Sequence, residues 1–427
     1  MNISFNKYYF SIPATLMLLV ASGCSDNDSK PVGNLKDKTY TASTGLELYY
    51  NGVEMPGKSF SFYQEGNNAT LKGFSEFDLS QLSALGLSGE LPCPGVIPGS
   101  PETVWNVSLT EKNGYLTFSG KDNNGICNYE YTGEINADRL KIYINDAVLN
   151  NQTLSGKIWI PAPIDKDADG IITSTPFYID WEIDPIPEID VDLSSLLESL
   201  TTLPFIPVYN NTAYMSLSQA LDQIVKTVAF RADGNILFTY ISTTGGAARI
   251  AQTQPNGLQY SIPEQGVIKL YVNPLSLFGF ILENASGSTP PEDVDLTGTG
   301  LYPSGNNSSN EGSSLSSLIS SPTAQAMVKS VLSEILPQLA TGIPLRYIQN
   351  GDELDIYIDT QASLGIIRTL IDSFLQNDEA VKSILSQLEK NPEIAPLLSD
   401  LPKFQNMIEQ VLLNTSTLRI GFAFKAQ

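Results

Sequence analysis

Short alternating runs of apolar and polar side chains dominate the first half of the chain. In the run 140–144 every second side chain is apolar, which is the period of a half-buried β-strand. Turn pairs such as Asn113-Gly114 separate neighbouring runs. The expected strands are 46–50, 59–63, 69–74, 103–109, 115–120, 128–134, 140–144 and 156–160. Antiparallel strands at this spacing predict a β-barrel or a β-sandwich over residues 39–182.

The second half of the chain mixes strands with helices. Helices are expected near 216–225, 323–340, 363–376, 378–390 and 402–414, where apolar side chains recur at the helical period. Strands are expected at 227–232, 235–242, 247–253, 258–262, 267–273, 343–349, 353–360 and 417–424. Helices gathered behind an antiparallel sheet predict an α+β domain over residues 213–427. Residues 284–314, rich in Ser, Gly, Asn and Pro, predict a disordered insert in that domain.

Two further segments mark the expected domain boundaries. Residues 24–38 are polar and charged and predict a flexible tether. Residues 183–212 are rich in proline and predict a linker between the two domains. The expected fold class is therefore mixed β and α+β. It consists of an antiparallel β-barrel or sandwich domain, followed by an antiparallel sheet with helices packed on it.

The first 24 residues have the pattern of an export signal. Lys7 is their only basic side chain, an apolar run covers 8–20, and the segment ends in Ala21-Ser22-Gly23-Cys24. A positive start, a short apolar core and small residues before a cut are typical of a signal peptide, here residues 1–23. The cysteine directly after the small residues resembles a bacterial lipoprotein box, in which Cys24 is acylated and becomes the first mature residue. An ordinary signal peptide or an uncleaved anchor helix is the alternative.

The composition narrows the possible functions. The chain has 46 acidic and 24 basic side chains, and the resulting net charge of −22 argues against a nucleic-acid partner. Histidine is absent, which removes Ser-His-Asp and Cys-His nucleophiles and His-ligated zinc. A mean hydropathy of −0.05 is too polar for a multi-pass membrane protein. Carboxylate chemistry, calcium binding, or no chemistry at all remain.

One acidic loop has the spacing of a calcium site. Asp165, Asp167 and Asp169 occupy the first, third and fifth positions of such a loop, and a glycine follows for the sharp turn. The carbonyl of Ile171 would be the next ligand. Pro176 stands where a bidentate glutamate closes the usual site. We expect a weak structural calcium site with these four ligands, and a solvated acidic turn is the alternative.

Besides the acylated Cys24, two cysteines remain as free thiols after the signal is removed, Cys93 and Cys127. In a non-cytosolic compartment they predict a disulfide, which would stabilise the fold by roughly 3–4 kcal/mol in the chain-entropy model. Two separate buried thiols are the alternative. Their spacing is unlike that of a redox motif.

Aromatic and acidic side chains are the other candidates for function. Trp105 shares a face with apolar neighbours and is expected in the core, whereas Trp159 is expected to be exposed and able to stack on a sugar ring. Tyr49 and Tyr50 are expected on opposite faces of one strand. Acidic clusters at 182–192 and 352–359 leave carboxylate-based glycoside hydrolysis open. A half-exposed strand shows the same alternation.

Several stretches resemble a group of secreted Bacteroides lipoproteins of unknown function. The first half is similar to their calycin-like, lipocalin-related β-barrel domain at Tyr40, the 46–52 strand and turn, the 91–98 loop and the 131–144 hairpin. The second half resembles an uncharacterised domain of the same lipoproteins at 230–240, 258–274 and 342–345 with the hairpin that follows. Residues 25–28 resemble the acidic stretch that Bacteroidetes lipoproteins carry when they are sent to the cell surface. The resemblance transfers no catalytic residue.

Together these observations predict a surface-exposed outer-membrane lipoprotein, anchored to the membrane through Cys24. We expect it to bind a glycan or a small apolar ligand without catalysis, with calcium as the only cofactor and no nucleic-acid partner. A carboxylate-based glycoside hydrolase is one alternative. A structural or adhesive surface protein without a small ligand is the other.

Overall fold

The computed structural model describes residues 35–80, 89–168, 172–186, 206–208, 213–215, 217–242, 249–274, 336–375, 406 and 409–427. Several expected features lie outside these residues. They are the signal peptide 1–23, Cys24, nearly all of the tether, most of the 183–212 linker, Asp169, Ile171, the 284–314 insert and the helix at 378–390. The structural statements that follow concern the described residues.

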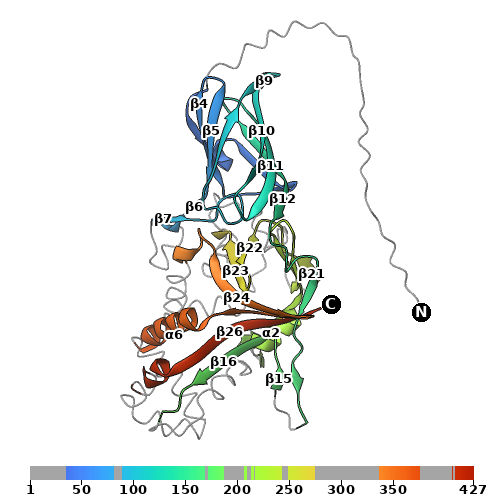
Figure 1. The fold of residues 1–427 in the computed structure, drawn as a ribbon, viewed down its shortest axis with the longest axis vertical. Coiled ribbons are helices and arrows are strands. Elements are labelled where there is room, and N and C mark those ends of the chain that lie inside the picture. Colours follow the sequence, from blue (N-terminus) through green and yellow to red (C-terminus); the bar gives the residue numbers. More distant parts are fainter. Residues whose placement is uncertain are drawn as a thin grey trace, which may run out of the picture.

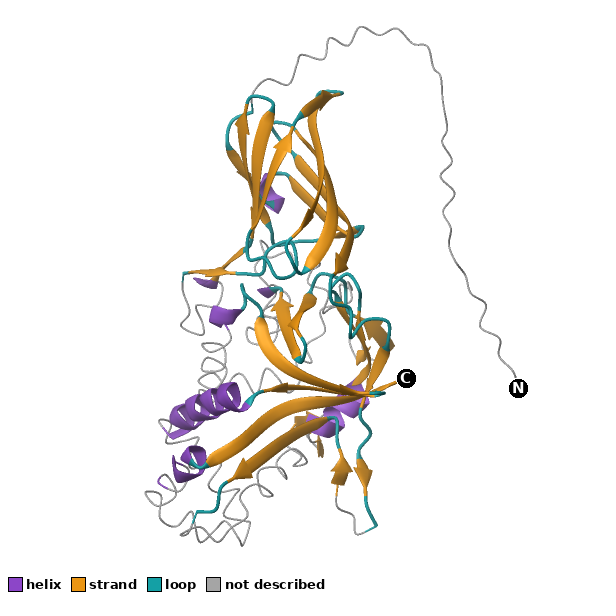
Figure 2. Cartoon of the chain, in the orientation of Figure 1, coloured by secondary structure: helices purple, strands orange, loops and turns teal. Residues whose placement is uncertain are grey.

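β-Strands form most of the described structure, in antiparallel and mixed sheets, which confirms the β-rich fold expected from the sequence (Figures 1 and 2). Two sheets make up the N-terminal unit. The first has the order β1 (Lys38–Tyr40), β4 (Ser59–Glu65), β5 (Asn68–Phe74), β8 (Thr103–Ser108). The second has the order β3 (Val53–Glu54), β2 (Leu46–Tyr50), β12 (Leu140–Leu149), β11 (Cys127–Ile135), β10 (Tyr115–Asn123), β9 (Thr110–Lys112). Strands β2 and β12 are parallel, and the other neighbours are antiparallel.

Aromatic side chains fill the space between these two sheets. Trp105 of β8 stacks on Tyr131 of β11, with ring centroids 4.2 Å apart, and Phe60 of β4 lies 5.4 Å from Trp105. All three side chains are buried, and the burial of Trp105 confirms the prediction from the alternation around it. The two sheets therefore pack face to face around a solid core. No hydrogen-bonded ladder joins them within the described strands, so the barrel that the sequence left open is not closed.

A ten-stranded antiparallel sheet forms the other unit. Its order is β21 (Arg249–Gln252), β20 (Ile236–Ser242), β19 (Val225–Phe230), β13 (Ile158–Pro161), β26 (Thr415–Ala426), β25 (Glu353–Ile358), β24 (Ile343–Asn350), β23 (Val267–Val272), β22 (Leu258–Glu264). The tenth strand, β16 (Phe177–Ile183), pairs with β26 as well. Three two-stranded pairs complete the strands: β6 (Glu76–Asp78) with β7 (Glu90–Pro92), β14 (Asp165–Lys166) with β15 (Ile172–Ser174), and β17 (Ile206–Val208) with β18 (Ala213–Met215).

The division between the sheets differs from the domain boundary expected at residue 182. Strand β13 and nearly all of β16 lie before that residue, yet both strands pair with β26 in the ten-stranded sheet. Trp159 of β13 is completely buried, so the prediction that it is exposed was wrong. Its neighbour Ile158 is the half-exposed side chain instead. Three consecutive apolar residues do not reveal which face of a strand is covered, because that depends on the sheet the strand joins.

Two helices confirm expectations from the helical period. Helix α2 (Leu217–Ile224) matches the helix expected at 216–225, and α6 (Thr360–Leu375) matches the one at 363–376. Leu364 of α6 packs against a small buried cluster that contains Trp181 and Leu418. The Thr360 hydroxyl accepts a hydrogen bond of 3.0 Å from the Leu418 amide. The start of α6 is thus attached to β26. A short 3₁₀ turn, η6 (Leu336–Gln338), lies where the helix at 323–340 was expected to end.

The two units share one core. The buried cluster of the N-terminal sheets continues without a break to Val228, Phe230 and Tyr260 of the ten-stranded sheet. At the junction the Tyr50 hydroxyl donates a 2.7 Å hydrogen bond to the Asp233 carbonyl. The side-chain amide of Asn256 donates to the carbonyls of Val53 and Glu54. Buried polar contacts of this kind hold the two units in one arrangement.

We expect Tyr50→Phe to weaken both units together. The substitution leaves the buried Asp233 carbonyl without its donor, and such a loss costs about 1–3 kcal/mol. Urea unfolding of the 25–427 fragment, followed by circular dichroism, measures the change. Tyr63→Phe is the matched control because Tyr63 is 48% exposed, and it should change the free energy of unfolding by less than about 0.5 kcal/mol. Equal losses in the two variants would contradict the role given to Tyr50.

Candidate functional site

The outer face of the second N-terminal sheet carries a row of aligned side chains across four strands. Tyr49 of β2 pairs with Tyr143 of β12, Tyr143 with Thr132 of β11, and Thr132 with Ser119 of β10. These four residues form one row of side chains across the sheet. The tyrosines are half-buried and the two hydroxyl residues are exposed, while the alternate residues of the same strands point into the core. Tyr49 and Tyr50 lie on opposite faces of β2, as expected.

The two tyrosines form a stacked pair at one end of this row. Their ring centroids are 5.1 Å apart and their planes differ by 19°. The ammonium of Lys141 lies over both rings, 5.5 Å from the centroid of Tyr49 and 5.1 Å from that of Tyr143. A hydrogen bond with Tyr143, and then contact with Glu47, raise the pKa of Lys141. Stacking and the cation hold the two rings in place.

A second row of side chains runs beside the first. Glu47 pairs with Lys141, Lys141 with Glu134, and Glu134 with Thr117. The guanidinium of Arg139 lies 2.7 Å from the Glu134 carboxylate and 3.4 Å from that of Glu47. Four of these five residues are charged, and we call the group the charged row. Its positive and negative groups neutralise one another locally, and each of the exposed pairs contributes little to stability.

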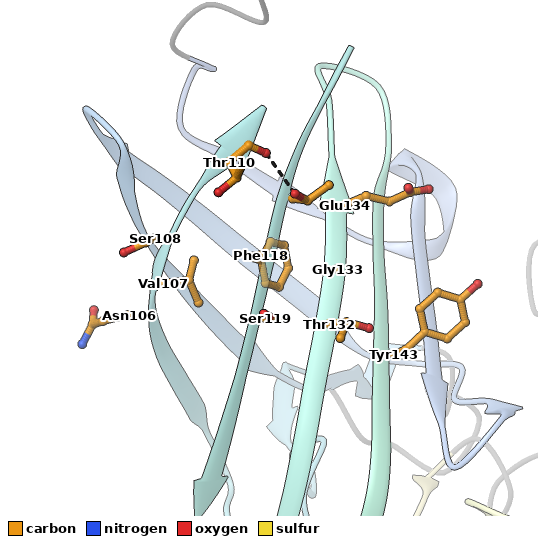
Figure 3. Close-up of a pocket in the computed structure, with 11 residues that line it drawn as sticks. Asn106, Val107, Ser108, Thr110, Phe118, Ser119, Thr132, Gly133, Glu134 and Tyr143 are labelled. Atoms are coloured by element: carbon orange, nitrogen blue, oxygen red, sulfur yellow. Dashed lines mark hydrogen bonds between the residues drawn. The ribbon is translucent and has the colours of Figure 1, made fainter. Parts of the chain in front are cut away.

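A groove of about 710 Å³ crosses the same face. It is lined by Asn106, Val107, Ser108, Thr110, Thr117, Phe118, Ser119, Thr132, Gly133, Glu134 and Tyr143 (Figure 3). The groove thus extends from Tyr143 on β12, across β11 and β10, to the edge of β8. Most of its polar groups are hydroxyls, and Glu134 supplies its carboxylate. Hydroxyls act as both donors and acceptors of hydrogen bonds, so the lining suits a ligand that is itself rich in hydroxyls.

The packing of a neighbouring aromatic ring requires glycine at one position that lines the groove. A Cβ atom on Gly133 would lie 2.2 Å from Cζ of Phe118. The absent side chain therefore lets the Phe118 ring lie against β11. Phe118 and Val107 are buried and also line the groove, so its floor includes apolar atoms beneath the hydroxyls.

A second hollow, of about 600 Å³, lies at the junction between the units. Its polar side chains are already engaged in structural contacts. The side chain of Asn51 exchanges two hydrogen bonds with the backbone of Ala147, and the Asp233 carboxylate lies 3.1 Å from the Arg231 guanidinium. The Asn235 amide also donates to Asp233. This hollow is a seam between the two units, and none of the described residues that line it is aromatic. The groove on the outer face has the rings of Tyr143 and Phe118 in its lining and is the better ligand site.

The predicted calcium loop is described only in part. Asp165 lies on β14, which pairs with β15, and Asp167 follows as an exposed residue. The other two expected ligands, Asp169 and Ile171, are outside the described residues. Among the residues that are described, no three acidic or cysteine side chains come together as a metal site. The calcium site stays a prediction.

Cys93 and Cys127 are free, buried thiols, so the predicted disulfide is not formed. The Cys93 thiol donates to the Leu91 carbonyl, whereas the Cys127 sulfur lies 4.0 Å from the Tyr50 hydroxyl. Burial raises the pKa of Cys93 to about 12 and that of Cys127 to about 11. The alternative of two separate buried thiols is the arrangement in the structure. Thiols with such high pKa values are poor nucleophiles at neutral pH.

The acidic residues proposed for hydrolysis are distributed along the ten-stranded sheet. Asp352 lies 3.2 Å from Lys157, Asp359 lies 3.5 Å from Arg346, and Glu182 accepts a hydrogen bond from Thr417. Burial raises the pKa of Asp355, and the nearby Glu353 adds to the effect. Asp352 and Asp359 are thus surface ion pairs, and Glu182 is held by a hydroxyl. Glu188, Asp190 and Asp192 lie outside the described part of the chain.

Comparison with known proteins leaves the function to be argued from this geometry. No family model matches the chain, and no curated protein or solved structure does so at a significant level. In the part of the chain that the structure describes, no helix has the length and apolar character needed to cross a membrane.

Lys58 is a buried amine outside the groove. It is 6% exposed, and its ammonium donates a 2.6 Å hydrogen bond to the Pro94 carbonyl. Burial lowers the pKa of Lys58 to about 8, although the neighbouring Cys93 partly opposes the shift. Between this value and its ordinary pKa of 10.5, the unfolded chain holds the proton and the folded chain does not. The contribution of Lys58 to stability therefore rises with pH in that window.

We expect the free energy of unfolding of the wild-type chain, minus that of Lys58→Met, to rise by about 2 kcal/mol between pH 7 and pH 10. The other titrating groups are shared by both chains, so their effects largely cancel in the difference. Urea unfolding at several pH values measures it. Lys72→Met, which removes an exposed amine paired with Glu102, is the control and should give no such rise. A difference that stays flat for Lys58→Met would show that its amine titrates normally.

Proposed function

We propose that this chain is a surface-exposed outer-membrane lipoprotein, anchored through acylated Cys24, that binds a glycan without catalysis. The groove beside the stacked tyrosines is the observation that supports the ligand class. The signal and lipoprotein box at the amino terminus support the location.

The lining of the groove suits a sugar in two ways. Tyr143 offers an aromatic ring, on which the C–H face of a pyranose can stack. Ser119 and Thr132 offer hydroxyls, and Glu134 offers a carboxylate, for the hydroxyl groups of the sugar. The hydroxyl of Ser108 donates to Asn68 and can still accept a hydrogen bond. A concave site with a few convergent polar groups over an apolar floor is the usual form of a small-molecule site.

The same structure argues against a small apolar ligand inside the N-terminal unit. A lipocalin-like ligand would need the space between the two sheets. Trp105, Tyr131 and Phe60 occupy that space, and each is buried. An apolar ligand would have to displace a packed aromatic core. This is why we assign the ligand to the outer face and choose a glycan.

The resemblance to secreted Bacteroides lipoproteins also supports this proposal. On that view the N-terminal unit is a calycin-like domain, opened into two facing sheets. The C-terminal unit is an α+β domain, in which α2 and α6 cover the ten-stranded sheet. Calcium at the loop of Asp165 and Asp167 would be a structural cofactor.

Glycan binding is tested first with an array of bacterial, plant and host glycans probed with the 25–427 fragment. A bound glycan is then titrated against Tyr143→Ala, which removes the ring of the groove. We expect the affinity to fall about tenfold, because one stacked ring contributes on the order of 1.4 kcal/mol. Tyr63→Ala, an exposed tyrosine on the other N-terminal sheet, is the control and should bind as the wild type does. An array without a single bound glycan would contradict the proposal, and cleavage of a bound glycan would favour the hydrolase.

Anchoring is tested by expressing the full chain with Cys24→Ala in a Gram-negative host. We expect the wild-type chain in the outer-membrane fraction and accessible to protease added to whole cells. The variant should lose the acyl chains that hold it there and leave that fraction. Cys93→Ala, which removes a buried thiol, should stay in the membrane. Retention of the Cys24 variant in the outer-membrane fraction would exclude a lipid anchor at this residue.

A further inference from the structure

From the layout of the groove we infer that its ligand is an uncharged linear oligosaccharide of about three to four units, which lies across the strands. This inference rests on the proposed glycan-binding function. It adds the length, the direction and the charge of the ligand.

The length follows from the strands that the groove crosses. Its lining begins at Tyr143 on β12, continues through Thr132 on β11 and Ser119 on β10, and reaches Thr110 on β9. Neighbouring strands lie about 4.8 Å apart, so these three steps span about 14 Å. Asn106 of β8 extends the lining further. One pyranose in an extended chain is similar in length to one strand spacing, so a single sugar would fill only a fraction of the groove.

The inferred direction of the ligand follows from the side chains that are aligned across neighbouring strands. Residues paired across the strands face the same side of the sheet, so Tyr143, Thr132 and Ser119 form a continuous line perpendicular to the strands. A ligand along that line meets an aromatic ring first and hydroxyls after it. The amide of Asn106 comes at the β8 end, where its oxygen accepts a hydrogen bond from Thr70 and its NH2 group can donate to a ligand. The ring would hold one sugar by stacking, and the hydroxyls would hold the following units by hydrogen bonds.

The inferred charge of the ligand follows from the side chains that line the groove and from the net charge of the whole chain. Among the described residues that line the groove, Glu134 is the charged side chain and none is basic. Arg139 and Lys141 lie near it, but their charges are paired with Glu134 and Glu47. The chain as a whole carries −22. A uronic or sulfated chain would therefore find no basic side chain in the lining to pair with, and the negative field of the whole chain would repel it.

The test is calorimetric titration of the 25–427 fragment with neutral gluco-, manno-, galacto- and xylo-oligosaccharides of one to six units. Galacturonic oligosaccharides of the same lengths form the acidic series. For at least one neutral series we expect the affinity to rise with each unit and to level off at about three to four. The acidic series should bind at least about tenfold more weakly than that neutral series.

One variant tests the inferred length of the ligand, and another tests its inferred charge. Asn106→Ala removes the amide at the β8 end, so it should weaken a tetrasaccharide several-fold and leave a disaccharide unchanged. Glu134→Gln should strengthen the acidic series and change the neutral series little. Glu130→Gln is the control for the second variant, because Glu130 lies on the same strand and does not line the groove.

The outcomes separate this inference from the proposed function. A monosaccharide that binds as tightly as a tetrasaccharide would overturn the inferred length, and a preference for the acidic series would overturn the inferred charge. Glycan binding would stand in both cases. If no oligosaccharide of either series binds and the glycan array is also blank, the proposed function fails together with the inference.

Discussion

The register between β2 and β12 is the constraint on which both the candidate site and the junction depend. Tyr49 and Tyr50 are consecutive, so one faces solvent and the other the core. In the observed register Tyr49 stacks on Tyr143, while Tyr50 reaches the Asp233 carbonyl of the other unit. A slip by one residue would place the polar side chains in the core and remove both contacts. The buried residues of β2, among them Leu48, oppose such a slip because they would become exposed.

The packed interior explains why the candidate site lies outside the sheets. Trp105 and Tyr131 stack in the space where a barrel would hold a ligand. The N-terminal unit therefore resembles a sandwich in its packing, and its outer face is the surface available for binding. That face carries aligned hydroxyls because the strands need polar side chains towards water. The same alternation that builds the core thus also builds the groove.

The net charge of the whole chain and the paired charges beside the groove have different effects. The chain has an excess of acid, which sets a negative field around it. Beside the groove the charges are balanced, because Arg139 joins Glu134 and Glu47 while Lys141 pairs with Glu47. Local balance leaves hydrogen bonding and stacking as the available forces for recognition. Lys58 shows the opposite situation, since a buried amine with one carbonyl partner keeps a lowered pKa.

The sequence by itself determined the β-rich fold, the helices α2 and α6, the burial of Trp105 and the opposite faces of Tyr49 and Tyr50. These features depend on local periodicity, which neighbouring residues decide. Only the tertiary structure decided that β13 and β16 join the ten-stranded sheet, that Trp159 is buried and that Cys93 and Cys127 stay apart. It also decided that Tyr49 lies beside Tyr143, almost a hundred residues away in the chain, and that a groove crosses that face. The partner and register of a strand depend on contacts between distant segments, and the period of one segment does not contain them.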